Sequence, residues 1–109
     1  MGDLSVSAGF VGAAGSCEWD WHNRPVDLAA FQQLMADTYG ERDRARGRAA
    51  SVAWLTEEVG ELAQAVRKGN REDQLHELAD VLAWVASLAD QLGLSLDEAA
   101  RRYADGCPR

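Results

Sequence analysis

Apolar residues recur at every third or fourth position along most of the chain, which is the period of one face of an α-helix. The most regular run extends from about Ala49 to Lys68 and carries Val52, Leu55, Val59, Leu62 and Val66. The next run follows Asn70 and carries Leu75, Leu78, Leu82, Val85, Leu88, Ala89 and Leu92. A shorter helix is expected from Asp27 to about Thr38, with the stripe Leu28, Phe31, Leu34 and Met35. Because no segment alternates in the manner of a strand, the pattern predicts an all-α protein.

The two long helices are predicted to form an antiparallel hairpin that turns at Gly69 and Asn70. Gly69 stands where a residue in the left-handed conformation would end the first of them. Asn70 is a good capping residue for the second, with Asp73 three residues later. The fold is therefore expected to be built around this hairpin.

The outer helices have signals at their ends as well. Pro25 marks an entry turn, and Asp27 is expected as an acid in the first turn of the helix that follows. Gly40 is expected to stop that helix, which leaves the basic segment "ERDRARGR" as a connector. Gly93 ends the third helix, and the capping box "SLDE" opens a short last helix from Ser95 through Tyr103.

Length and composition indicate one small domain, residues 25–109, preceded by a flexible tail, residues 1–24. The chain has 109 residues, of which 47% are apolar, and the tail is rich in Gly, Ser and Ala. A domain of this size buries a smaller fraction of its surface than a larger one does. We therefore expect a core that is completed by oligomerisation, as a homodimer or a homotetramer.

Charge and cysteine content exclude several classes of protein. A net charge of −7 disfavours binding of duplex nucleic acid, because an acidic surface repels phosphates. No apolar run reaches the roughly 18 residues that a membrane-spanning helix needs. Cys17 and Cys107 are far apart, which fits a reducing compartment better than a disulfide framework. We expect a cytoplasmic protein without membrane or duplex nucleic-acid partners.

Two pairs of carboxylates occupy matching positions on the two long helices. Glu58 and Glu61 are three residues apart and therefore lie on one helical face. Glu77 and Asp80 repeat this spacing on the second helix. Glu61 and Glu77 stand equally far from Gly69 on either side, and so do Glu58 and Asp80. In a hairpin that turns at Gly69, the four carboxylates fall on two adjacent levels.

Such a cluster is unfavourable without a cation, because the like charges repel one another. Oxygen ligands suit Mg²⁺ or Mn²⁺, hard cations that retain water and accept phosphate oxygens. The alternative is that acidic residues on these helices simply form a solvated surface, as we expect for Glu57 and Glu72. Asp73-x-x-His76 resembles half of a di-iron site, but the only other histidine, His22, lies in the tail. His76 is therefore expected at the surface.

Trp54 and Trp84 extend the symmetry about Gly69, one helical turn beyond Glu58 and Asp80 respectively. They are expected to border the carboxylates at the end distal to the turn. Two roles are open for them: stacking on a nucleobase, or a contact between helices or subunits.

The acidic motif as a whole resembles a known signature. E-E-x-x-E, followed after fifteen residues by E-x-x-D, is similar to the motif of the MazG-like, all-α nucleoside triphosphate pyrophosphohydrolases. This superfamily includes dUTPases and phosphoribosyl-ATP pyrophosphatases. The similarity covers roughly residues 26–108, including "FQQLMADTYGERDRARG", "WLTEEVGELAQAVRKG" and "ELADVLAWVASLA". The resemblance implies a four-helix bundle completed by dimerisation.

It also implies an activity, the hydrolysis of a nucleoside triphosphate to the monophosphate and pyrophosphate in nucleotide-pool housekeeping. The cofactor would be Mg²⁺ or Mn²⁺, held by Glu58, Glu61, Glu77 and Asp80. The catalytic residues would be Glu57, Glu58 and Glu61, with Glu57 orienting or deprotonating the attacking water.

Substrate contacts are expected from Lys68 near the turn and, by the resemblance, from Arg102 and Tyr103 on the phosphate side. Trp54 and Trp84 are the candidates for the nucleobase. Two other functions remain open: a phosphoribosyl-ATP pyrophosphatase, and a metal-stabilised helical interaction module without turnover. The preferred nucleotide is not determined, because base selection depends on pocket shape rather than on the metal motif.

Overall fold

The computed structural model describes residues 26–107, and these residues form helices without any strand. The helices are α1 (Leu28–Arg46), α2 (Arg48–Lys68), α3 (Arg71–Gln91) and α4 (Leu96–Arg101). The prediction of an all-α fold is confirmed. The expected tail, the entry turn at Pro25 and the cysteine at position 17 lie outside the described residues. None of the helices in the described range has the length and apolar content needed to cross a membrane.

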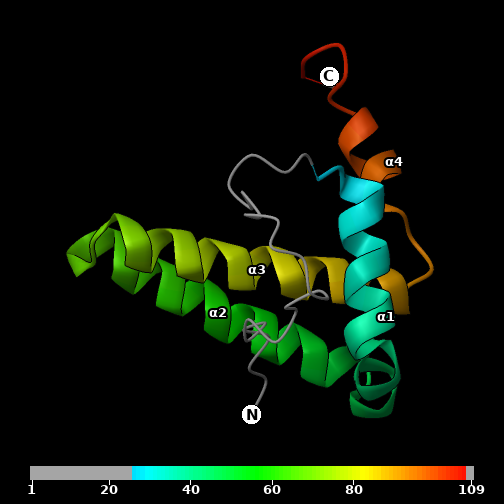
Figure 1. Ribbon diagram of the computed structural model, residues 1–109, viewed down its shortest axis with the longest axis horizontal. Helices are drawn as coiled ribbons and strands as arrows, with labels where there is room; N and C mark the ends of the chain where they lie inside the picture. Colours follow the sequence, from blue (N-terminus) through cyan, green and yellow to red (C-terminus); the bar gives the residue numbers. More distant parts are fainter. Residues whose placement is uncertain (1–25, 108–109) are drawn as a thin grey trace, which may run out of the picture.

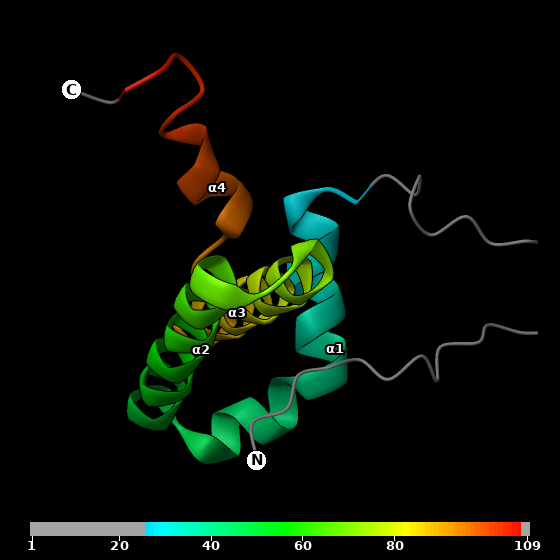
Figure 2. The ribbon, with the colours of Figure 1, turned by 90° about the vertical axis from the view of Figure 1, so that its left-hand side faces the viewer.

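The two long helices α2 and α3 lie side by side as the predicted antiparallel hairpin (Figure 1). α1 packs mainly on α3 and runs across the hairpin at the end distal to its turn (Figures 1 and 2). α4 packs on α1 and projects beyond it. The middle and the turn of the hairpin are consequently left uncovered by the other described elements.

At the turn of the hairpin, Asn70 caps α3 as predicted, but Gly69 does not adopt the left-handed conformation that was expected for it. The amide of Asp73 donates to Asn70 Oδ1 at 2.9 Å, and the amide of Asn70 donates to Asp73 Oδ2 at 3.1 Å. Gly69 is not left-handed: its φ of −95° and ψ of 177° are open to any residue. A Cβ there would lie 2.8 Å from the carbonyl oxygen of Ala65. The position therefore requires glycine because a Cβ would clash there, and not because of the backbone conformation.

The prediction that Gly40 stops the first helix is wrong. α1 continues through it to Arg46, and the segment expected as a connector forms most of the end of α1. Glycine within a helix costs about 1 kcal/mol relative to alanine, and burial of neighbouring side chains exceeds that cost. Tyr39 and Asp43 are buried on this part of the helix. The break comes instead at Gly47, where φ is +89°.

The remaining helix ends follow the prediction more closely. Asp27 caps α1 from outside, accepting a 2.7 Å hydrogen bond from the amide of Ala30, and is not a first-turn residue. Gly93 follows α3 with a left-handed φ of 69°. Ser95 caps α4 through a 3.1 Å bond from the amide of Glu98. α4 is shorter than expected, because the chain turns away after Arg101.

The hydrophobic core is small and sits where α1 crosses α3. Its buried members are Met35, Tyr39, Ala83, Trp84 and Ala86, with Phe31, Trp54, Leu55 and Leu96 packed against them. Much of the apolar stripe predicted for the hairpin is exposed instead, including Val52, Val59, Val66, Leu75, Leu78 and Leu82. Within the described part of one chain, the hairpin thus presents an apolar face to solvent.

Candidate metal centre

Three of the four predicted ligands converge between α2 and α3. Glu58, Glu77 and Asp80 each place one carboxylate oxygen within 4.8 Å of the others. Glu58 comes from α2, whereas Glu77 and Asp80 lie one helical turn apart on α3. The antiparallel register about the turn is what brings these residues together.

Glu58 has the most unusual environment of the group. It is only 7% exposed, and its Oε2 atom is buried without a hydrogen-bond partner among the described residues. Burial, together with the charges of Glu61 and Asp80, raises the pKa of Glu58 from 4.5 to about 7. The folded chain therefore resists ionisation of this carboxyl group near neutral pH.

Glu77 shares the same situation on the opposite helix. Its Oε2 atom is also buried and unpartnered in the described structure. Burial raises the pKa of Glu77, and a hydrogen bond with Glu61 adds to the effect. Two buried carboxylate oxygens of this kind lack the compensation that buried charges normally have.

The donor set fits a hard divalent cation. It consists of carboxylate oxygens, which suit Mg²⁺ or Mn²⁺, and the cation would supply the partner that the oxygens of Glu58 and Glu77 lack. Asp80 is also approached by its helix neighbour His76, with 3.5 Å between Nε2 and Oδ2. That contact holds one Asp80 oxygen on the side of α3.

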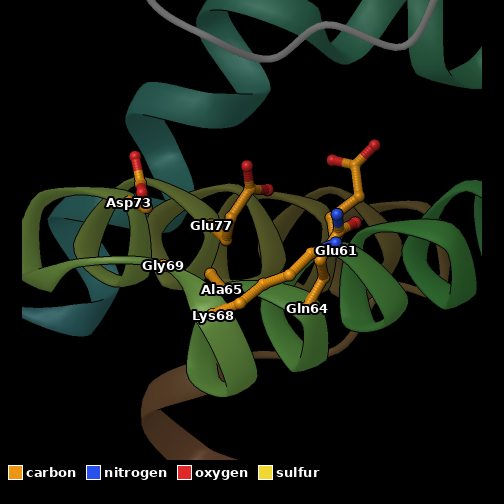
Figure 3. A pocket seen from close by; sticks show the side chains of 7 residues that line it. All are labelled: Glu61, Gln64, Ala65, Lys68, Gly69, Asp73 and Glu77. Carbon is orange, nitrogen blue, oxygen red and sulfur yellow. The ribbon is translucent and has the colours of Figure 1, made fainter.

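Glu61 stands at the edge of this group rather than inside it. Its side chain lies close enough to Glu58 and Glu77 to raise the pKa of both. It also lines a hollow of about 440 Å³ between the carboxylates and the turn, together with Gln64, Ala65, Lys68, Gly69, Asp73 and Glu77. In Figure 3 the carboxyl groups of Asp73, Glu77 and Glu61 point to the same side of the hairpin. Lys68 is the one basic side chain among the seven that line this hollow.

The remaining acidic candidate, Glu57, is exposed on α2 and does not belong to the three-residue group. Its neighbour Glu58 faces α3, and successive helical residues point about 100° apart. The structure therefore places Glu57 beside the centre, one step round the helix, as its spacing predicts.

The two tryptophans are in contact with each other. Their ring centroids are 6.1 Å apart and the rings are nearly parallel, at 10°. Trp84 is completely buried, whereas Trp54 is partly exposed. Trp84 thus serves as a contact between helices, and its ring is not accessible for stacking on a nucleobase in this arrangement.

The last two substrate candidates lie elsewhere on this chain. Arg102 and Tyr103 are exposed and follow α4, which packs on α1. Figure 1 shows α4 at the opposite end of the molecule from the hairpin turn. Within one chain, the structure does not bring these two residues to the hollow that contains Lys68.

Sequence reasoning missed a buried ion pair at the end of α1. Asp43 and Arg46 join through a 2.6 Å contact between Oδ1 and Nη1, and the Arg46 guanidinium lies 4.7 Å from the ring centroid of Trp84. The expected helix stop at Gly40 hid this pair. The available signal was the spacing of four that continues from Met35 through Tyr39 to Asp43.

Comparisons with known proteins agree with this geometry. The profile of the MazG nucleotide pyrophosphohydrolase domain matches residues 46–107, a segment that contains all four carboxylates. The uncharacterized protein YvdC of Bacillus subtilis (strain 168) is 30% identical, over 73% of this chain and 92% of that protein. With the all-helical fold and the acidic motif in register, these matches show that the chain belongs to the MazG nucleotide pyrophosphohydrolase domain family, a family of pyrophosphohydrolase-type enzymes.

Proposed function

We propose that this protein hydrolyses nucleoside triphosphates to nucleoside monophosphates and pyrophosphate, with Mg²⁺ as cofactor. The observation that carries the proposal is the buried, unpartnered oxygen of Glu58 beside carboxylate oxygens of Glu77 and Asp80. Membership of the family supports the reaction type, and the oxygen-only donor set supports a hard cation.

In this proposal Glu58, Glu77 and Asp80 hold the cation, and Glu61 completes the set from its edge. The bound cation supplies neutralisation of triphosphate oxygens and lowers the pKa of a nearby water. Glu57 orients that water or accepts its proton. Lys68 binds phosphate oxygens in the hollow near the turn, where its charge offsets that of the leaving pyrophosphate.

The proposal also concerns the identity of the nucleotide substrate. Housekeeping of non-standard or surplus triphosphates is the function that we favour. Trp54 is the aromatic ring available for a base, since it is partly exposed and Trp84 is not. Stacking on an indole discriminates weakly between bases, so selectivity depends on other contacts.

We also propose that the active form is a homodimer or homotetramer. The support is the exposed apolar face of the hairpin, which includes Val59, Val66, Leu78 and Leu82. Large exposed apolar patches on small proteins usually mark interaction surfaces. A second copy would also offer a route for Arg102 and Tyr103 to reach the hollow of its partner.

The proposed activity is tested by incubating the full chain with natural and modified triphosphates and with phosphoribosyl-ATP, with and without Mg²⁺, while measuring pyrophosphate. Glu61→Gln and Asp80→Asn are expected to abolish pyrophosphate release with helicity intact by circular dichroism. Glu72→Gln, an exposed acid on α3, is the control and should retain activity.

The outcomes separate the candidate functions. Retained pyrophosphate release in both site variants would rule out the proposed centre. Exclusive turnover of phosphoribosyl-ATP would assign the chain to that branch of the superfamily. Thermal stabilisation by Mg²⁺ without consumption of any substrate would indicate the non-catalytic helical module instead.

A further inference from the structure

A largely buried charged pair, Asp43 and Arg46, lies in the last turns of α1. The side chains of Asp43 and Arg46 are only 2% and 17% exposed, and their contact is 2.6 Å long. A buried ion pair adds little to stability by itself, because desolvation offsets the attraction between the charges. A role for this pair is therefore sought in the residues that it contacts.

The guanidinium of Arg46 lies over the indole of Trp84 at 4.7 Å. Arginine is suited to this contact because its planar guanidinium stacks on aromatic faces and donates hydrogen bonds in fixed directions. Asp43 accepts one of those hydrogen bonds and so fixes the plane of the group. α1 thereby holds the Trp84 ring although it supplies no carboxylate to the metal centre.

Trp84 in turn stacks on Trp54 across the gap between α3 and α2. Trp54 lies one turn from Glu58, and Trp84 lies one turn from Asp80, so the ring pair occupies the level next to the carboxylates. The ring pair lies between the two helices at this level and limits how closely they can approach. Further from the hairpin turn, the side-chain amide of Gln91 on α3 donates a 2.8 Å hydrogen bond to the Ser51 hydroxyl on α2. This bond joins the two helices beyond the ring pair.

A metal centre is sensitive to this separation, because its ligand distances must hold to within a few tenths of an ångström. Residues that orient the ligands typically change metal affinity by about 10- to 100-fold when they are replaced. The contacts from Asp43 through Arg46 and the two indoles end beside Glu58 and Asp80, which come from different helices.

We propose that Arg46, oriented by Asp43, is a positioning residue that fixes the distance between Glu58 and Asp80 through the stacked pair Trp84 and Trp54. The inference rests on the proposed metal centre. It assigns to α1, the helix that was predicted to end at Gly40, an influence on the geometry of the metal centre.

The test is Mn²⁺ affinity of the full chain, measured by the electron paramagnetic resonance signal of free Mn²⁺. Arg46→Met and Arg46→Lys are expected to weaken binding by about tenfold or more. Simple electrostatics predicts the reverse for Arg46→Met, since removal of a nearby positive charge favours a cation. Near-ultraviolet circular dichroism should change as well, because it reports the packing of the indoles.

Arg44→Met is the matched control, because it removes the same charge from the same helix at a side chain that is 65% exposed. It should leave Mn²⁺ affinity within about twofold. If an Arg46 variant does not fold, Trp54→Leu approaches the same contacts from the exposed side and should show the same loss of affinity.

Two failures are distinguishable. If the Arg46 variants fold and lose stability in urea but bind Mn²⁺ like the wild type, Arg46 is merely structural and the inference is overturned, while the proposed function stands. If the wild-type chain binds no Mn²⁺, the proposed centre fails and the inference fails with it.

Discussion

Because the carboxyl group of Glu58 is buried, the free energy of unfolding is expected to depend on pH. Burial raises the pKa of Glu58 to about 7, so the folded chain keeps a proton that the unfolded chain releases above about pH 4.5. The stabilising contribution of this group is complete below the unfolded pKa. It is lost progressively as the pH rises towards 7.

Urea unfolding in the presence of a chelator should reveal this loss. We expect the free energy of unfolding to decline between pH 5 and pH 7, with a contribution from Glu58 of roughly 1 kcal/mol per pH unit. Excess Mg²⁺ should reduce the decline, because the cation replaces the proton. A Glu58→Gln chain that shows the same decline as the wild type would exclude Glu58 as its source.

The same substitution makes a second prediction at a fixed pH. At pH 8 without a divalent cation, Glu58→Gln removes a buried charge and should stabilise the chain by up to about 3 kcal/mol. The stabilisation that Mg²⁺ gives the wild type should disappear. Differential scanning fluorimetry with and without Mg²⁺ measures both effects, and Glu72→Gln is the exposed control. A variant that still responds to Mg²⁺ like the wild type contradicts the assignment.

At the scale of elements, the turn between α2 and α3 determines which carboxylates meet. The reciprocal hydrogen bonds of Asn70 and Asp73 fix the start of α3, and Gly69 allows the chain to pass close to Ala65. A shift of one residue in this turn would rotate Glu77 and Asp80 away from Glu58, since neighbouring helical residues point about 100° apart.

The steric role of Gly69 can be separated from a conformational one. Gly69→Ala should destabilise the chain by roughly 1–3 kcal/mol, because its Cβ would lie 2.8 Å from the Ala65 carbonyl oxygen. Gly69→Asn should cost at least as much, whereas a left-handed position tolerates asparagine. Thermal unfolding of both variants, with the exposed Arg67→Ala as control, tests this. A well-tolerated Gly69→Asn would contradict the steric explanation.

At the scale of the whole molecule, the core and the candidate centre occupy neighbouring levels of the hairpin, the core at the end crossed by α1. The core gathers under α1, whereas the face that carries Val59 and Leu78 stays exposed on a single chain. A small core and an exposed apolar face together favour association with another copy.

Analytical ultracentrifugation should therefore find a multiple of the 11.9 kDa chain mass. Val59→Lys and Leu78→Lys should shift the protein towards the 11.9 kDa species, because a lysine in an apolar contact is left without a partner. Val26→Lys changes a more exposed valine outside the hairpin and should leave the mass unchanged. A monomeric wild type at micromolar concentration would overturn the proposed assembly.

Much of the fold follows from local signals in the sequence. Helix periodicity, the Asn70 cap and the end of the third helix at Gly93 are properties of short segments, and the structure has all three. The pairing of Glu58 with Asp80 also followed, because an antiparallel hairpin has one register once its turn is known. The stop at Gly40 failed because packing of α1 on α3 outweighs the low helix propensity of one glycine.

The sequence alone determined the two long helices, the turn between them and the levels on which the carboxylates meet, since spacing along a helix converts directly into position. Only the tertiary structure decided that Glu58 is buried, that Trp84 is a core residue, and that Arg46, paired with Asp43, contacts the Trp84 ring. The physical reason is that burial depends on which element covers a helical face. For Trp84 that element is α1, which is distant from it in sequence.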